Sequence, residues 1–292
     1  MKGQVQLVQQ VGVLGRAAPE SRIGLANMDA MRGVSSAWGV CPGGGYPSDL
    51  VRWGLVSDRQ VIIDTRFCGP SDSANGGYVC GVLAEILGGT AEVTLRRPPP
   101  IDPPLTAREV PEGGVGLFDG AGLVARGLAA APPEIRPPAA VSQEEAIAAA
   151  ERYPGFTGHP FPTCFVCGPE RDEDGLRIFP GSVSGRDLVA APWQPDPTLA
   201  DEDGLVRPRF QWAALDCSGA FASGFPTISM VLGRLTATLL EPVRPGQDCV
   251  VLGWSEGSEG RKHFAGTALL DGDGALLALA RATWISLPPA GS

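Results

Sequence analysis

The chain contains the stretch Cys164-Phe165-Val166-Cys167-Gly168-Pro169, and Gly175-Leu176-Arg177-Ile178 follows it a few residues later. A second stretch, Trp212-Ala213-Ala214-Leu215-Asp216, places one carboxylate in an otherwise apolar segment. A third, Gly69-Pro70-Ser71-Asp72-Ser73-Ala74-Asn75-Gly76-Gly77, precedes a segment that is apolar nearly all round, as a fully buried helix should be. These three stretches indicate the fold, because the strands and helices predicted around them occur in the same order twice.

The predicted elements describe a tandem repeat. In the first half, apolar patterning and turn residues predict a strand, a buried helix and four further strands, at residues 60–67, 78–87, 90–97, 104–111, 115–119 and 122–130. The second half has two strands, a helix and four long strands, at residues 176–183, 187–193, 209–223, 228–241, 248–256, 262–271 and 275–287. In each half the strand after the helix ends at a proline, Pro98 or Pro242. We therefore interpret the chain as a duplication.

The three stretches resemble motifs of the hotdog-fold thioesterase superfamily, in particular of its phenylacetate-pathway-type and acyl-CoA thioesterases. The cysteine stretch resembles the segment that opens a hotdog domain, and Asp216 stands where the family's central helix carries a catalytic carboxylate. The run Asn75-Gly76-Gly77 resembles the His-Gly-Gly turn that begins this helix, with Asn75 where the family usually has His. The resemblance implies an α+β fold, a double hotdog in which a long helix in each half is wrapped by an antiparallel sheet.

Four parts are expected along the chain: a disordered or loosely packed N-terminal segment, an N-terminal hotdog domain, a proline-rich linker with a short helix, and a C-terminal hotdog domain, at residues 1–57, 58–135, 136–160 and 161–288. The first segment lacks sustained periodicity and contains a Pro and Gly cluster, and Met28 and Met31 leave the natural start open. In the linker, Ser142 and Glu145 have the spacing of a capping box, which predicts a helix over 142–152.

Composition limits the classes of function. The chain has 292 residues, of which 43% are hydrophobic and 19% charged, as in globular proteins, and no apolar run approaches the ~20 residues of a transmembrane helix. A net charge of −9 disfavours nucleic-acid and membrane partners. Seven cysteines and the lack of a signal-peptide pattern make the cytoplasm the expected compartment. A homo-oligomer is left open, and an anionic CoA partner would need a local Arg or Lys cluster.

Thioester hydrolysis needs hydrogen-bond donors for the oxyanion and a carboxylate that attacks or activates water. In the resembled family, six residues separate the His-Gly-Gly turn from the acid. Here Asn75-Gly76-Gly77 keeps both glycines, but the acid position falls on Ala84, with Glu85 one residue late. In the second half the acid position is Asp216, while the turn reads Arg207-Pro208-Arg209. The first half therefore has the glycine turn without the acid, and the second half has the acid without the glycine turn. We therefore predict one composite catalytic site of Asn75, Gly76, Gly77 and Asp216, and one defunct site.

Four residues beside these motifs are the candidates for substrate binding: Asp72, Tyr78, Trp212 and Ser218. Structural alternatives stand beside these roles. Asp72 also suits a helix cap, and Ser218 could position a water or bond to its own helix backbone. Asp216 could be a buried carboxylate with a purely structural partner.

The pair Cys164 and Cys167, with His159 nearby, has half of the pattern of a structural zinc site. No second Cys-x-x-Cys or His pair is present in the sequence, so a further ligand would have to come from one of the scattered residues Cys41, Cys68, Cys80, Cys217 and Cys249. In the resembled thioesterases this cysteine pair is not generally a metal site. We therefore expect packed free thiols and no metal or cofactor. The other histidine, His263, follows Arg261 and Lys262, which indicates either a phosphate-contacting edge or plain surface.

Two rival enzyme classes are disfavoured. Hotdog hydratases and dehydratases use a histidine, and neither predicted central helix contains one. A Ser-His-Asp hydrolase would need a Gly-x-Ser-x-Gly elbow, which is absent from the sequence. The hypothesis is a hydrolase of acyl-CoA or acyl-carrier thioesters. The alternative is a noncatalytic acyl-thioester-binding or regulatory protein, because Asn75 replaces the usual His and half of the motif set is missing.

Overall fold

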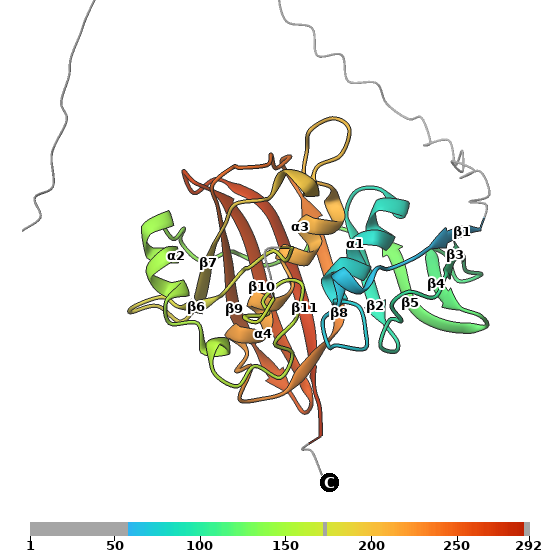
Figure 1. Cartoon of the computed structure of the whole chain (residues 1–292), viewed down its shortest axis with the longest axis horizontal. Helices are drawn as coiled ribbons and strands as arrows, with labels where there is room; N and C mark the ends of the chain where they lie inside the picture. The colour runs from blue at the N-terminus through green and yellow to red at the C-terminus, as the bar shows by residue number, and fades with distance from the viewer. Residues whose placement is uncertain (1–57, 172–173, 289–292) are drawn as a thin grey trace, which may run out of the picture. The chain divides into compact units, whose positions relative to one another are not determined.

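The computed structural model describes residues 58–171 and 174–288, and the segment 1–57, expected to be disordered or loosely packed, lies outside them. In the described part, eleven strands form one antiparallel sheet (Figure 1) in the order β1-β3-β4-β5-β2-β8-β11-β10-β9-β7-β6. The first repeat contributes β1 to β5, at Arg59–Val61, Ala91–Leu95, Leu105–Glu109, Val115–Asp119 and Gly122–Ala129. The second contributes β6 to β11, at Gly181–Ser182, Val189–Trp193, Met230–Leu239, Cys249–Glu259, Lys262–Asp271 and Leu276–Ser286.

The two repeats join edge to edge at β2 and β8, the strands predicted to follow each central helix. Their register places Ala91 opposite Ala237 and Val93 opposite Leu235, so a pair of small side chains and a pair of larger aliphatic side chains are buried along the seam. At one end, the Thr90 hydroxyl donates to Thr238 Oγ1 across 2.8 Å. Because the strands pair with each other, neither repeat leaves its β2 or β8 edge unpaired.

Four α-helices lie in the described residues: α1 (Gly76–Leu87), α2 (Gln143–Ala150), α3 (Pro208–Ala214) and α4 (Cys217–Ala222). The predicted capping box of α2 is confirmed, because Ser142 Oγ accepts from the Glu145 N–H and Glu145 Oε2 from the Ser142 N–H. Helix α1 ends as predicted at Gly88, whose φ of 73° suits glycine. None of these helices is long and apolar enough to cross a membrane.

The single helix predicted over 209–223 is wrong, because the chain breaks between α3 and α4. Asp216 has φ −82° and ψ −80°, outside the helical region. The carbonyl of Leu215 accepts a 2.7 Å hydrogen bond from the Thr267 hydroxyl on β10. This tertiary contact gives the Leu215 carbonyl a partner outside the helix at the break.

Two predicted strands are also shorter than expected. After β1, the segment predicted to extend to residue 67 forms a 3-10 turn instead, in which Asp64 Oδ1 accepts from the Arg66 N–H at 2.7 Å. In the segment predicted as 176–183, only β6 is a strand. The amides of Leu176 and Ile178 donate to the carbonyls of Phe165 and Val166, so this segment pairs with the cysteine stretch rather than with the sheet.

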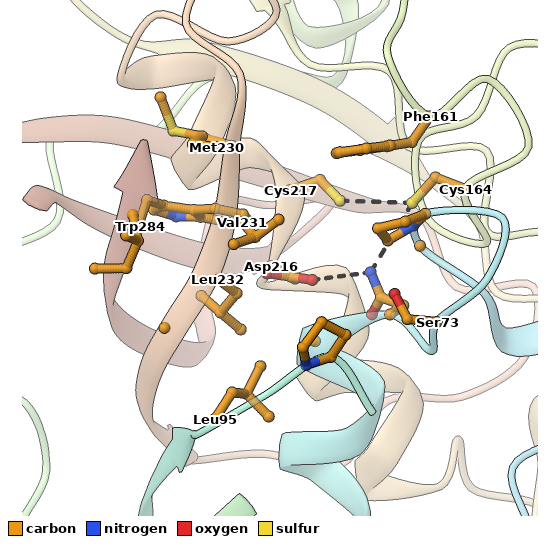
Figure 2. A pocket seen from close by; sticks show the side chains of 18 of the residues that line it. Ser73, Leu95, Phe161, Cys164, Asp216, Cys217, Met230, Val231, Leu232 and Trp284 are labelled. Carbon is orange, nitrogen blue, oxygen red and sulfur yellow. Dashed lines mark hydrogen bonds between the residues drawn. The ribbon is translucent and has the colours of Figure 1, made fainter. Parts of the chain in front are cut away.

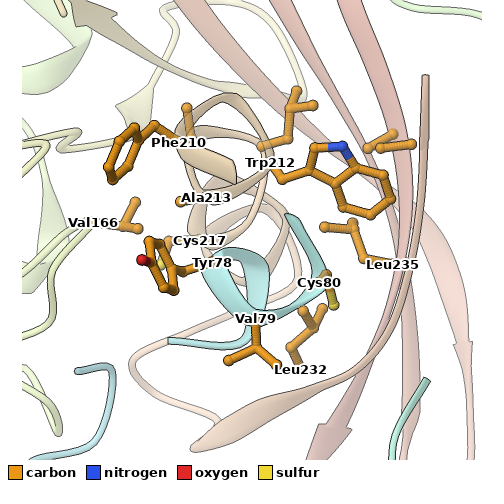
Figure 3. Packing of buried hydrophobic residues seen from close by; sticks show 14 of the residues in the cluster. Tyr78, Val79, Cys80, Val166, Phe210, Trp212, Ala213, Cys217, Leu232 and Leu235 are labelled. Atoms are coloured by element: carbon orange, nitrogen blue, oxygen red, sulfur yellow. The ribbon is translucent and has the colours of Figure 1, made fainter. Parts of the chain in front are cut away.

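Helix α1 packs against α3 at unusually close range through two glycines on one face. A Cβ atom on Gly81 would lie 2.5 Å from the Arg209 Cα, and one on Gly77 would lie 2.5 Å from the Asp216 Cβ. Around this contact, a buried apolar cluster includes Tyr78 and Trp212 (Figure 3). The spacing of Gly77 and Gly81, four residues apart, puts both on the same side of α1.

We expect Gly81→Val to lower the free energy of unfolding by at least about 3 kcal/mol, because the added side chain must push α3 away. Gly272→Ala is the control, since its Cβ would have ordinary contacts and we expect a change within about 0.5 kcal/mol. Chemical denaturation followed by circular dichroism measures both. Equal stability of the Gly81 variant and the wild type would contradict the close packing.

Candidate active site

The first turn of α1 holds the Asp216 carboxylate from the other repeat. Asn75 caps α1 by accepting from the Tyr78 N–H through Oδ1, and its Nδ2 donates to Asp216 Oδ2 at 2.9 Å (Figure 2). The Gly77 N–H donates to the same oxygen at 2.9 Å. The helix N-terminus, with its unsatisfied N–H groups, is a favourable place for a negative charge. The structure thus brings three of the four predicted catalytic residues into direct contact.

Asp216 combines burial with an incomplete set of partners. Its side chain is 2% exposed, and burial raises its pKa to about 7, with the charge on Cys164 adding to the rise and the Gly77 N–H and Asn75 amide opposing it. Its second oxygen, Oδ1, has no hydrogen-bond partner among the described residues. Asp216 therefore has one oxygen that is held by two donors and one buried oxygen without a hydrogen-bond partner among the described residues.

The loop before α1 is fixed by contacts with both repeats. The Asn75 N–H donates to the Phe67 carbonyl at 2.8 Å, and the Phe165 N–H donates to the Cys68 carbonyl at 2.8 Å. The Tyr78 ring stacks on Phe67 with centroids 4.2 Å apart. These contacts hold the cap residue at one position relative to Asp216.

A cavity of about 390 Å³ borders this contact and has a mainly apolar lining. Asn75, Gly76 and Asp216 contribute to its wall. Strands β2, β8 and β11 contribute apolar side chains, and the loops around α4 contribute others (Figure 2), including Leu95, Phe161, Phe225, Met230, Val231, Leu232, Trp284 and Ile285. The size and lining are those of small-molecule sites, which join apolar walls to a few polar groups.

The four predicted substrate-binding residues do not line this cavity. Tyr78 and Trp212 are 4% and 1% exposed and pack in the core, where aromatic side chains stabilise the contact between the helices. Asp72 is exposed on the loop before α1, and its alternative role as a helix cap is wrong, because Asn75 is the N-cap of α1. Ser218 is fully buried on α4, and its hydroxyl has no hydrogen-bond partner in the described part of the chain.

The carboxylate of the first half, Glu85, lies one residue after the position that the repeat relates to Asp216, and it forms an ion pair. Glu85 Oε1 accepts from the backbone N–H of Arg209 at the start of α3, at 2.9 Å, and from its Nε at 2.9 Å. The guanidinium also pairs with Glu85 Oε2, and the Glu85 contacts raise the pKa of Arg209. The carboxylate of Glu85 is thus balanced by a cation, whereas that of Asp216 is held by neutral donors.

Next to Asp216, the structure gathers three thiols that are far apart in sequence. Cys164, Cys167 and Cys217 have sulfur atoms within 4.8 Å of one another, all are buried, and all line the cavity. Hydrogen bonds from the Cys167 and Cys217 thiols lower the pKa of Cys164. In the sequence, Cys217 is one of several scattered cysteines, and only the tertiary structure shows that the residue after Asp216 points to the Cys-x-x-Cys turn.

No protein-family model matches the chain, and no curated protein matches it. Solved structures, in contrast, match the chain. A TesB protein of Mycobacterium avium subsp. paratuberculosis superposes with a TM-score of 0.53 at 12% identity, over 79% of this chain and 93% of that one. A putative thioesterase from Novosphingobium aromaticivorans superposes with a TM-score of 0.52 at 15% identity, over 79% of this chain and 96% of that one. An acyl-CoA thioesterase II, TesB2, from Mycobacterium marinum superposes with a TM-score of 0.52 at 11% identity, over 80% of this chain and 94% of that one.

At these identities the similarity concerns the fold, and it extends over both repeats and nearly the full length of each compared chain. The antiparallel sheet and the central helices of this chain fit an α+β hotdog fold. The chain therefore has the double hotdog fold of these thioesterase structures, with both hotdog units in one polypeptide.

Proposed function

We propose that the protein hydrolyses acyl thioesters at the junction of α1 and Asp216. The observation that carries this proposal is a buried carboxylate with one unpaired oxygen, beside a helix N-terminus, in the wall of a ligand-sized apolar cavity. The acyl chain would occupy the apolar part of the cavity. The thioester carbonyl would lie at the polar wall formed by Gly76 and Asp216.

The donor best placed for the oxyanion is the N–H of Gly76 rather than that of Gly77. The Gly77 N–H already donates to Asp216, whereas no hydrogen bond is formed by the Gly76 N–H within the described ranges. Gly76 also lines the cavity. A free amide at the positive end of the helix dipole would stabilise negative charge that develops on the carbonyl oxygen.

Asp216 would act through Oδ1. With Oδ2 held by Asn75 and Gly77, the carboxylate has one orientation, and Oδ1 would either take a proton from a water that attacks the carbonyl or attack the carbonyl itself. Either route transfers the acyl group to water and releases the thiol. The requirement common to both is a carboxylate at position 216.

Two arginines at the cavity would suit the phosphates of CoA. Arg96 and Arg261 line the cavity and are exposed, and the guanidinium of Arg96 has no hydrogen bond or ion pair within the described part of the chain. Their neighbour Arg97 is engaged with Asp119 at 3.2 Å. Arg96, and Arg261 whose Nε donates to the Ser286 carbonyl, would supply positive charge at the cavity for an anionic substrate in a chain of net charge −9.

A noncatalytic acyl-thioester-binding protein is the second candidate. It is favoured by the fact that Asn75 and Gly77 both direct a hydrogen bond to Asp216, as in a structural carboxylate site. A panel of acyl-CoA thioesters separates the two functions. Steady release of free thiol supports the hydrolase, and saturable binding without release supports the alternative.

We expect Asp216→Asn to lower kcat/KM by at least ~100-fold, because the amide keeps the shape and removes the base or nucleophile. Thiol release from acyl-CoA measures the loss, and circular dichroism checks the fold. Glu85→Gln is the matched control: it changes the carboxylate of the first half, which pairs with Arg209, and should leave kcat/KM within a few-fold of the wild type. A full loss in the control, or near-normal activity in Asp216→Asn, would contradict the assignment.

Arg96→Ala should raise KM for acyl-CoA and leave kcat nearly unchanged, because it removes a contact that is the same in ground and transition states. The same acyl group on N-acetylcysteamine, which lacks the phosphates, should be hydrolysed equally by variant and wild type. Arg244→Ala serves as a control, since this exposed arginine does not line the cavity. An equal effect on both thioesters would argue against a phosphate contact.

A further inference from the structure

The three-cysteine cluster has the dimensions of a thiolate metal site. The Cys164 and Cys217 sulfur atoms lie 4.0 Å apart (Figure 2), and all three sulfur atoms lie within 4.8 Å of one another. Around a tetrahedral zinc ion with Zn–S bonds of about 2.3 Å, sulfur atoms are separated by roughly 3.8 Å. Only small side-chain movements would bring the thiolates to that distance. A disulfide between Cys164 and Cys217 would need a much larger approach, to about 2.05 Å.

Hydrogen bonds and close packing fix the conformation of the Cys-x-x-Cys turn. The Gly168 N–H donates to the Cys164 carbonyl at 2.9 Å, and a Cβ atom on Gly168 would lie 2.4 Å from the Cys164 nitrogen. The two residues between the cysteines are held by the amides of Leu176 and Ile178. The Cys167 carbonyl accepts from the Tyr153 hydroxyl at 2.7 Å. The turn therefore keeps both thiols on the side that faces Cys217.

Polar groups around the cluster are arranged as donors to sulfur. The Asn75 amide, 2.9 Å from Asp216, also lies 3.9 Å from Cys164 Sγ. His159 Nε2 lies 3.4 Å from Cys167 Sγ, and its Nδ1 accepts from the Phe161 N–H. A neutral histidine that accepts at Nδ1 carries its proton on Nε2. His159 is thus a hydrogen-bond donor to the Cys167 sulfur in this arrangement, not a metal ligand.

We propose that Cys164, Cys167 and Cys217 bind one thiophilic divalent metal ion of the zinc class, with the fourth coordination position directed to the cavity. Three soft thiolates select such ions over oxygen-preferring cations. All three cysteines line the cavity, so a water or a small ligand can complete the tetrahedron. This proposal differs from the sequence-based expectation of packed free thiols, because the fold brings Cys217 to the Cys-x-x-Cys turn. The inference does not depend on the proposed hydrolase activity.

Cobalt is the probe for this site. The full-length protein, reduced and then loaded with CoCl2 or ZnCl2 and desalted, should retain about one ion per chain by elemental analysis. The cobalt form should show the visible bands of a tetrahedral site and a near-ultraviolet charge-transfer band whose intensity corresponds to about three thiolates. The spectrum of the wild type tests the ligand count even where a cysteine variant fails to fold.

Variants assign the ligands. Cys164→Ser and Cys217→Ser should each lower the retained cobalt by at least ~10-fold, because metal affinity depends on each ligand. Cys68→Ser is the matched control and should retain the ion, since this buried thiol of the loop before α1 donates to the Thr163 carbonyl and lies outside the cluster. His159→Gln and Asp216→Asn should retain the ion, because neither residue is a ligand in the proposal.

Three results would overturn the site. The first is cobalt retention far below one equivalent by the folded, reduced wild type. The second is a disulfide between any two of the three cysteines in freshly purified protein, detected by mass spectrometry after thiol alkylation. The third is loss of the metal in His159→Gln with retention in Cys217→Ser, which would move the site elsewhere.

Discussion

The close packing of α1 on α3 is the constraint on which the rest of the site depends. Glycine at positions 77 and 81 removes the Cβ atoms that would hold the helices apart, so the backbone of α1 lies against Arg209, Trp212 and Asp216. At this separation a backbone N–H of one repeat reaches a carboxylate of the other across 2.9 Å. Any larger residue at position 77 would occupy the space of the Asp216 side chain, so the site and the packing of the repeats are inseparable.

The carboxylates of the two repeats, Glu85 and Asp216, have different hydrogen-bond partners. Glu85 receives both the backbone N–H and the guanidinium of Arg209, so its charge is balanced by a cation. Asp216 receives only the neutral Asn75 amide and the Gly77 N–H, and it is almost completely buried. A buried carboxylate without a cation is costly to ionise, which is why its pKa rises to about 7. One junction thus contains an ion pair, and the other contains a buried carboxylate without a cation partner.

Local signals in the sequence were sufficient for most of the architecture. Hairpin turns, prolines and apolar runs located all four long strands of the second repeat and the helix α1, because these features act within a few residues. The shared motif spacing also singled out Asn75 and Asp216, which the structure places in contact although 141 residues separate them. The prediction was possible because the two repeats can be aligned with each other. The alignment shows that the first repeat has the glycine turn and that the second has the acid.

By itself, then, the sequence determined the repeat order, the capping box of α2 and the residues at the junction of the two repeats. Tertiary structure alone decided three further features: the helix break at Asp216, which accompanies a hydrogen bond from distant Thr267; the burial of Tyr78 away from the cavity; and the meeting of Cys217 with the Cys-x-x-Cys turn. Each rests on contacts between residues far apart in the chain. Local periodicity carries no information about such contacts, because they arise only when the sheet and the helices are packed together.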